Sequence, residues 1–76
     1  MYQDLVEYIV KSLVDNPDDV RVTEVEGSSA IVLEVTVAEA DVGRVIGKKG
    51  RVINSIRTII QVQGARQGKR VSVEVL

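Results

Sequence analysis

The sequence predicts an α+β domain with the element order α-β-β-α-α-β, in which a three-stranded sheet carries three helices on one face. Two kinds of periodicity support this fold class. Apolar residues recur every three or four positions in some segments and at alternate positions in others. The chain has 76 residues, and a domain of that size buries about 60% of the surface of its unfolded chain. We therefore expect a single two-layer domain over residues 1–76.

The first half of the chain predicts a helix followed by a hairpin. Apolar residues at helical spacing occupy 2–14, and Pro17 ends this helix because the residue before a proline disfavours helical geometry. Residues 20–26 are rich in β-formers, but Val25 departs from their alternation, which predicts a bulge or an early strand end. A glycine-serine turn then leads into strict alternation over 31–37, which predicts a second, half-buried strand.

The second half predicts two helices joined by a glycine turn, followed by a strand. Residues 39–46 predict one or two helical turns, and apolar residues at helical spacing over 52–60 predict a longer helix. The segment 64–68 begins and ends with glycine and predicts a loop. Valines alternate over 71–75 as a last strand, reached from the hairpin through a helical crossover.

The composition excludes most enzyme classes. There is no Cys and no His, which removes disulfides, thiolate zinc sites, the usual general base and the commonest metal ligand. There is no Trp or Phe and there are only two Tyr, which argues against a platform that stacks several bases on aromatic rings. We expect no catalytic residue, no metal, no cofactor and no small-molecule substrate.

The hydropathy pattern argues against a membrane protein. The longest apolar runs are about four residues, against about 18 for a bilayer-spanning helix. The first residues carry Asp4 and Glu7 instead of the basic stretch of a signal peptide. The expected location is therefore the cytoplasm, with no membrane partner.

A net charge of −1 conceals a strong asymmetry along the chain. Residues 1–43 hold ten acidic and two basic side chains, whereas residues 44–76 hold eight basic side chains and one acidic. One interpretation is that acidic and basic surfaces pair with each other within the fold. The other is a local anion-binding site in the second half.

The segment 45–53, Val-Ile-Gly-Lys-Lys-Gly-Arg-Val-Ile, is the one motif that suggests chemistry. Glycines at both ends of its turn allow the backbone to approach a ligand closely. The helix that begins near Gly50 offers free N–H groups and a partial positive charge, which favour anions. The spacing fits neither a P-loop nor a dinucleotide fingerprint. A site for a sugar-phosphate backbone is therefore predicted, with the surrounding cations Arg44, Lys48, Lys49, Arg51 and Arg57.

The motif and the element order together resemble a type II KH domain. The hallmark Val-Ile-Gly-x-x-Gly-x-x-Ile is matched at Val45, Ile46, Gly47, Gly50 and Ile53. A bare Gly-x-x-Gly is weakly specific, but the full hallmark between two helices in the right element order is strong. The resemblance covers the whole chain and is to the small stand-alone bacterial KH proteins of the KhpA family.

The resemblance implies a binding site for about four nucleotides of single-stranded RNA, with single-stranded DNA as a further candidate. The turn holds phosphates, apolar side chains form a groove for the bases, and the second hairpin strand forms the opposite wall. Ile53 is equally an ordinary core residue, Arg57 is equally a partner for an acidic side chain, and the cations of 66–70 favour a solvated loop over a second site. The RNA-binding residues implied are Gly47, Lys48, Lys49, Gly50, Arg51, Val45, Ile46, Ile53, Arg44 and Arg57.

The same resemblance implies a biological role and protein partners. Members of the family act as RNA chaperones or post-transcriptional regulators, in pathways that touch cell shape and division. They form homodimers, or heterodimers with a larger KH-containing protein. The alternative is that the fold serves mainly as a protein-interaction and dimerisation module, with RNA binding secondary.

Overall fold

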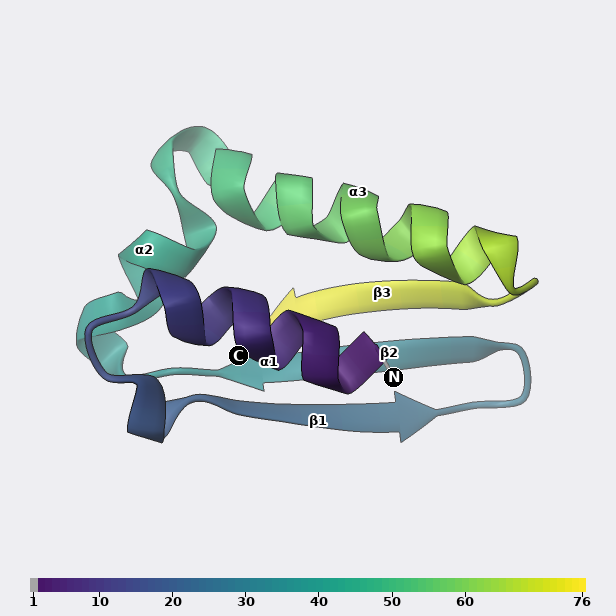
Figure 1. The fold of residues 1–76 in the computed structure, drawn as a ribbon, viewed down its shortest axis with the longest axis horizontal. Coiled ribbons are helices and arrows are strands. Elements are labelled where there is room, and N and C mark those ends of the chain that lie inside the picture. Colours follow the sequence, from purple (N-terminus) through teal and green to yellow (C-terminus); the bar gives the residue numbers. More distant parts are fainter. Residues whose placement is uncertain (1) are drawn as a thin grey trace.

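The computed structural model describes residues 2–76, and at its centre is a three-stranded mixed sheet (Figure 1). Strands β1 (Arg21–Glu26) and β2 (Ala30–Thr36) form an antiparallel hairpin. Strand β3 (Arg70–Val75) pairs with β2 in the parallel sense, so that the order across the sheet is β1-β2-β3. The middle strand is thus β2, and both β1 and β3 are edge strands.

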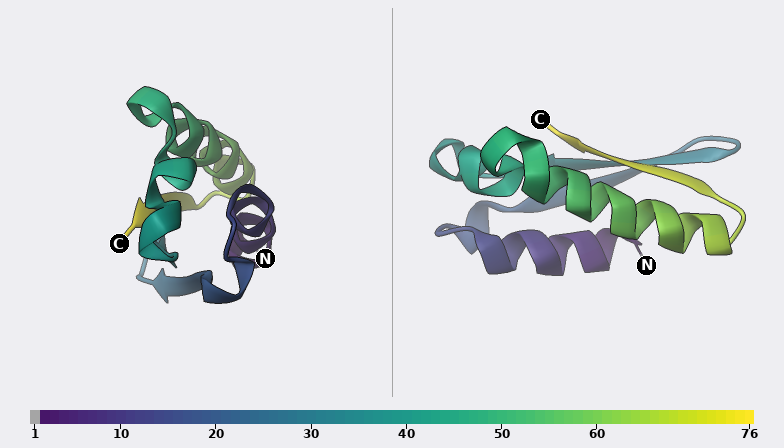
Figure 2. Two further views of the ribbon diagram at one scale, coloured as in Figure 1. Left: turned by 90° about the vertical axis from the view of Figure 1, so that its left-hand side faces the viewer. Right: turned by 90° about the horizontal axis from the view of Figure 1, so that it is seen from above.

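The helices form the second layer, on one face of the sheet (Figure 2). Helices α1 (Tyr2–Leu13) and α3 (Arg51–Arg66) lie along this face, and the short α2 (Val42–Ile46) sits at one end, where it contacts both. At the opposite end the Tyr2 hydroxyl donates a hydrogen bond to the side chain of Gln67. The expected α+β fold with three helices on one face is confirmed.

The hydrophobic core lies between the two layers. The alternating apolar positions of β2 and β3 face the helices, as their periodicity predicts. Helices α1 and α3 contribute apolar side chains at intervals of three or four residues. The largest fully buried apolar side chains are Leu33, Ile60, Val6, Val10, Val35, Val45 and Val73.

The break in alternation at Val25 causes neither a bulge nor an early strand end, so that expectation is wrong. The register of β1 against β2 is continuous from Arg21 to Glu26. Val25 pairs with Val32 and is 48% exposed. The helices cover only the other face of the sheet, so an apolar side chain on this face stays accessible to solvent and does not disturb the ladder.

Gly64 does not begin a loop, contrary to the sequence-based expectation. Helix α3 continues through it to Arg66, and Gly64 is buried. A Cβ atom at this position would lie 2.8 Å from Cγ2 of Val71 and 2.9 Å from the carbonyl oxygen of Lys69. The glycine therefore allows β3 to pack closely against the end of the helix, and the true turn is at Gly68, where φ is 70°.

Candidate nucleic-acid interface

The glycine turn connects α2 to α3 and is held by backbone hydrogen bonds. The N–H of Gly47 donates to the carbonyl oxygen of Gly43 at 2.9 Å, and the N–H of Gly50 donates to that of Gly47 at 3.1 Å. Both Gly47 (φ 76°) and Gly50 (φ 75°) lie in the positive-φ region that favours glycine. A Cβ atom on Gly47 would lie only 2.4 Å from Cγ2 of Val52. The turn is therefore tight, and its geometry depends on Gly47 in particular.

The two lysines of the turn project into solvent. Lys48 and Lys49 are both exposed, and neither lies within 4.0 Å of a carboxylate in the part of the chain that the structure describes. Lys49 has φ 58° and ψ 25°, a left-handed conformation that costs an L-residue about 1 kcal/mol. The turn thus presents two unpaired ammonium groups beside the start of α3.

The first turn of α3 adds to this positive potential. Its first residue, Arg51, is exposed, and its N–H donates to the carbonyl oxygen of Lys48. The N-terminus of the helix carries a partial positive charge. No acidic residue occurs between Asp41 and Glu74, a stretch that includes α2, the glycine turn and all of α3. The positive end of the helix and the cationic side chains therefore lie together at one end of the helical layer.

Two of the other expected cations are held by neighbours. The guanidinium of Arg44 forms an ion pair with Asp15 at 3.1 Å, and both side chains are largely exposed. Arg57 is half-buried, and its Nε donates to the carbonyl oxygen of Val73 at 3.0 Å while Nη1 donates to Oδ1 of Asn54 at 3.2 Å. The alternative in which Arg57 pairs with an acid is thus not what the structure shows.

The three apolar residues of the motif differ in exposure. Val45 is fully buried and Ile53 is 4% exposed, so both belong to the core. Ile46 is only half-buried and packs at the edge of that core. Of the three, Ile46 therefore has the most surface to offer a ligand, whereas Val45 and Ile53 hold the two helices in place beneath the turn.

Strand β2 does not offer free backbone groups to bases, which corrects that part of the sequence-based expectation for the opposite wall of the groove. As the middle strand, β2 uses its backbone groups in the ladders with β1 and β3. The strand beside α3 is β3, whose outer edge pairs with no strand among residues 2–76. The N–H of Leu76 donates to Val35 on β2, whereas the carbonyl of Val73 points outward to Arg57. Alternate residues of β3 therefore direct their backbone groups to the open edge.

A buried carboxylate that sequence reasoning missed anchors α2. Asp41 is 1% exposed and directly precedes that helix. Its Oδ1 accepts a hydrogen bond from the N–H of Asp15 at 3.1 Å, and its Oδ2 accepts two from Asn16, from the backbone N–H and the side-chain amide, each at 3.0 Å. The only sequence signal was its position just before a short apolar helix.

The pKa of Asp41 reflects these contacts. Burial of the carboxyl raises its pKa, but the hydrogen bonds from Asp15 and Asn16 lower it. The positive charge of Arg44 lowers it further, and the net pKa lies below the usual aspartate value. The carboxylate is therefore ionised at neutral pH and ties the segment after α1 to the start of α2.

Residues 2–76 hold neither a membrane span nor a metal cluster. No helix there is long and apolar enough to cross a membrane. No three His, Cys, Asp or Glu side chains gather in that range where they could hold a metal ion.

A helix–Gly-x-x-Gly–helix unit packed on a mixed three-stranded sheet defines a KH domain. The sequence model of the KH domain of KhpA and KhpB matches residues 3–75, and the chain belongs to this family. It is 51% identical over 72 residues to RNA-binding protein KhpA of Clostridium acetobutylicum, covering 95% of this chain and 96% of that protein. It is 50% identical over 74 residues to RNA-binding protein KhpA of Aquifex aeolicus, covering 97% and 94% of the two chains.

One solved structure shows the same fold. It is the crystal structure of a variant of Era from Aquifex aeolicus bound to GDP and aluminium fluoride. The TM-score is 0.60 at 22% sequence identity, and the match covers 97% of this chain and 29% of that one. At this identity the likeness concerns the fold alone.

Proposed function

We propose that this protein is a non-catalytic RNA-binding protein that holds short single-stranded RNA through the turn Gly47–Gly50 and the apolar surface beside it. In this role it acts as an RNA chaperone or post-transcriptional regulator. The observation that carries the proposal is the pair of exposed, unpaired lysines on a tight glycine turn at the start of α3. The name of its relatives, RNA-binding protein KhpA, agrees with it.

The geometry of the turn suits a phosphodiester backbone. Two glycines leave room for a phosphate to approach the main chain, and the ammonium groups of Lys48 and Lys49 supply charge on either side. In this arrangement bases would contact the half-buried Ile46 on one side and the open edge of β3 on the other. Aliphatic contacts grip bases without ring stacking, so a single domain should bind with modest affinity and loose sequence preference.

Lys48→Gln/Lys49→Gln should weaken binding of a short single-stranded RNA by roughly 25-fold at 0.1 M salt. Each phosphate contact to a single strand adds about −0.7 to the slope of log affinity against log salt. Two contacts therefore raise RNA affinity about 25-fold when salt falls from 1 M to 0.1 M. The double variant loses this gain, and its slope is shallower by about 1.4. Gln has the same backbone preferences as Lys at the left-handed position 49. Fluorescence anisotropy at several salt concentrations measures both effects.

The matched control is Lys11→Gln/Arg21→Gln, which removes one Lys from the end of α1 and one Arg from the start of β1, both outside the glycine turn and α3. It should bind like the wild type. Circular dichroism confirms that all variants are folded, and single-stranded DNA of matched sequence shows whether the 2′-hydroxyl is recognised. Unchanged RNA affinity in a folded Lys48→Gln/Lys49→Gln variant would exclude the turn as the site.

Apolar residues on the outer face of α3 favour a second function, dimerisation. Ile59 and Val62 are 52% and 56% exposed and lie three positions apart on the helix. A second copy of this chain, or a larger KH-containing protein, would cover them. Two linked RNA sites would then bind more tightly than one through effective concentration.

Val62→Lys should abolish self-association if α3 forms the dimer contact. Sedimentation equilibrium would show a dimer for the wild type and a monomer for the variant, with unchanged circular dichroism. A wild type that stays monomeric at high concentration, with or without RNA, contradicts a homodimer. A tight dimer indifferent to RNA would favour the interaction module as the main function.

A further inference from the structure

A second group of cations lies at the far end of α3 from the glycine turn. Arg66 ends the helix, and Lys69 and Arg70 begin the path into β3; we call these three residues the basic corner. All three are exposed, and none lies within 4.0 Å of a carboxylate among residues 2–76. The interpretation that acidic and basic surfaces pair within the fold therefore does not apply to the basic corner among the described residues.

The corner borders a groove between α3 and β3. The groove has a volume of about 450 Å³ and is open to solvent. Small side chains leave it wide, and an amide and a hydroxyl provide hydrogen-bonding groups in addition to the two cations. Its lining residues are Gln61, Ala65, Lys69, Arg70, Val71 and Ser72.

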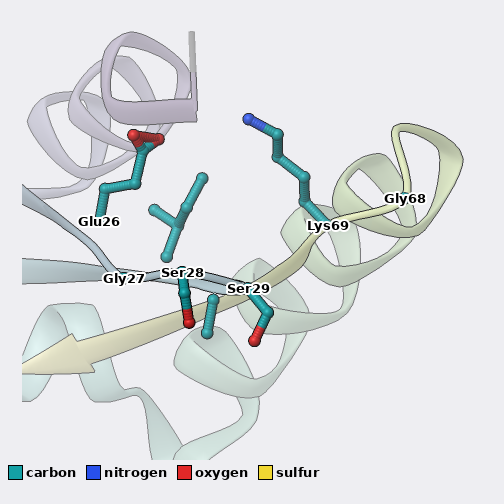
Figure 3. A pocket seen from close by; sticks show the side chains of 8 residues that line it. Glu26, Gly27, Ser28, Ser29, Gly68 and Lys69 are labelled. Atoms are coloured by element: carbon teal, nitrogen blue, oxygen red, sulfur yellow. The ribbon is translucent and has the colours of Figure 1, made fainter.

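Lys69 also borders a second hollow, of about 430 Å³, between the hairpin turn and the end of α3 (Figure 3). Glu26 stands on the other side of this hollow, and its carboxylate forms no ion pair with Lys69 among the described residues. The hydroxyls of Ser28 and Ser29 point away from both charged groups (Figure 3). Lys69 thus borders both cavities, and its ammonium group forms no ion pair with any residue of 2–76.

Helix α3, which connects the glycine turn to the basic corner, carries no negatively charged side chain. Over its 16 residues α3 is about 24 Å long. No acidic side chain therefore interrupts the path along the helix between its two basic ends. Arg57, half-buried against Val73, is the one cation between Arg51 and Arg66.

The sheet order confines this path to one side of the molecule. Most acidic residues of 2–26 belong to α1, the following turn and β1, which is one edge strand of the sheet, whereas β3 is the other edge strand (Figure 1). Two acidic residues lie nearer the corner: Glu26 across the hollow from Lys69, and Glu74 on β3 itself. A polyanion would therefore be attracted to α3 and the basic corner, where cations outnumber the two acidic side chains.

We propose that the basic corner is a second phosphate-binding site, and that one RNA strand held at the glycine turn continues along α3 to reach it. The inference rests on the proposed function, because the occupant is the same RNA. At about 3.4 Å per phosphate in a stacked strand, the length of α3 corresponds to about seven nucleotides. An RNA of about four nucleotides therefore fills the turn alone, and one of about twelve reaches both sites.

The test is a pair of NMR titrations of the ¹⁵N-labelled chain, with oligouridylates of about four and about twelve nucleotides. The proposal expects the shorter RNA to shift amides around Gly47 and Gly50 only, and the longer RNA to shift those of Gly68 and Lys69 as well. Lys69→Gln/Arg70→Gln should bind the shorter RNA like the wild type. It should bind the longer RNA roughly 25-fold more weakly at 0.1 M salt, with a slope shallower by about 1.4.

Lys11→Gln/Arg21→Gln makes the same change of charge away from the path and should alter neither titration. The equivalence point of the titration establishes that one protein binds each oligonucleotide. The corner site is refuted if Lys69→Gln/Arg70→Gln binds both RNAs like the wild type, or if the two double variants weaken binding equally. Failure of the proposed function is separate: Lys48→Gln/Lys49→Gln would then bind the shorter RNA unchanged.

Discussion

Gly47→Ala is expected to lower the free energy of unfolding by about 3–5 kcal/mol, which for a domain of 76 residues is a large part of a total of about 4–11 kcal/mol. Two costs combine. With φ 76° and ψ 170°, Gly47 lies in a backbone region that is essentially restricted to glycine, which costs an alanine about 1–3 kcal/mol. The new Cβ would also lie 2.4 Å from Cγ2 and 2.9 Å from the backbone nitrogen of Val52, and such overpacking costs a further 1–3 kcal/mol or so.

Two other glycines of the same segment provide graded controls. Gly50→Ala introduces a positive-φ penalty of about 1–2 kcal/mol, but its Cβ would meet only the Nδ2 atom of Asn54 at 3.4 Å. Gly43 lies within α2 with nothing inside 4 Å of a Cβ, and Gly43→Ala should stabilise the helix by about 0.5–1 kcal/mol. Urea unfolding monitored by circular dichroism measures all three. Equal stabilities of the Gly47 and Gly50 variants would contradict this account.

The position of the turn also depends on Gly47. If the fold accommodates the Gly47→Ala substitution, the start of α3 must move away from the end of α2, which displaces the lysines between them. We therefore expect RNA binding to fall even under conditions where this variant remains folded. The Gly43→Ala variant keeps the turn and should retain wild-type affinity.

Asp41→Asn is expected to lower the melting temperature by roughly 10 °C. The carboxylate accepts hydrogen bonds from two backbone N–H groups and one side-chain amide in a buried position. An asparagine has a single acceptor oxygen, and its own NH2 group would face one of these donors, so at least one buried polar group loses its partner. Differential scanning calorimetry at pH 7 measures the change.

Asp15→Asn is the matched control for the charge. It removes the exposed ion pair with Arg44 but keeps the backbone N–H of residue 15 that donates to Asp41. Exposed ion pairs contribute about 0–1 kcal/mol, so its melting temperature should change little. A loss of stability as large as that of Asp41→Asn would locate the effect in the ion pair and contradict the role given to the buried carboxylate.

The pH dependence follows from the direction of the Asp41 pKa shift. Its folded-state pKa is lowered, so the unfolded chain takes up the proton first as the pH falls. The stabilisation is therefore complete above the unfolded-state pKa of about 3.9 and is lost as the pH falls through the lower folded-state value. The difference in melting temperature between the wild type and Asp41→Asn should narrow in this acidic range. A constant difference from pH 7 to strongly acidic conditions would exclude linkage to Asp41.

Hydrophobic periodicity predicted the elements well because it records which side of each element faces the core. The spacing of Val6 and Val10, and of Ile53, Ile56 and Ile60, corresponds to the buried faces of α1 and α3. The same reasoning failed at Gly64, a helical residue whose role is to allow a neighbouring strand to pack closely. Gly64 was interpreted as a breaker, although it is a contact surface for β3, and nothing in its immediate sequence distinguishes the two roles.

The residues of the glycine turn were likewise identified from the sequence, because a Gly-Lys-Lys-Gly segment between two apolar helices has little use in a core. Which strand has an open edge beside α3 was not identified correctly. Strand order is a property of long-range pairing, and only the structure shows that β2 is central and β3 is at the edge. The carboxylate of Asp41 was missed for a related reason, since its partners lie 25 and 26 residues away along the chain.

Residue type and short-range spacing were sufficient to predict the fold class, the location of the glycine turn and the absence of His and Cys chemistry. They could not predict which cations remain unpaired and which are held by neighbours. Arg44 forms an ion pair with Asp15, and Arg57 donates a hydrogen bond to the carbonyl oxygen of Val73. The lysines of the turn and the basic corner form no ion pair with a carboxylate among residues 2–76. Those contacts depend on how the sheet order brings distant segments together, which local spacing does not encode.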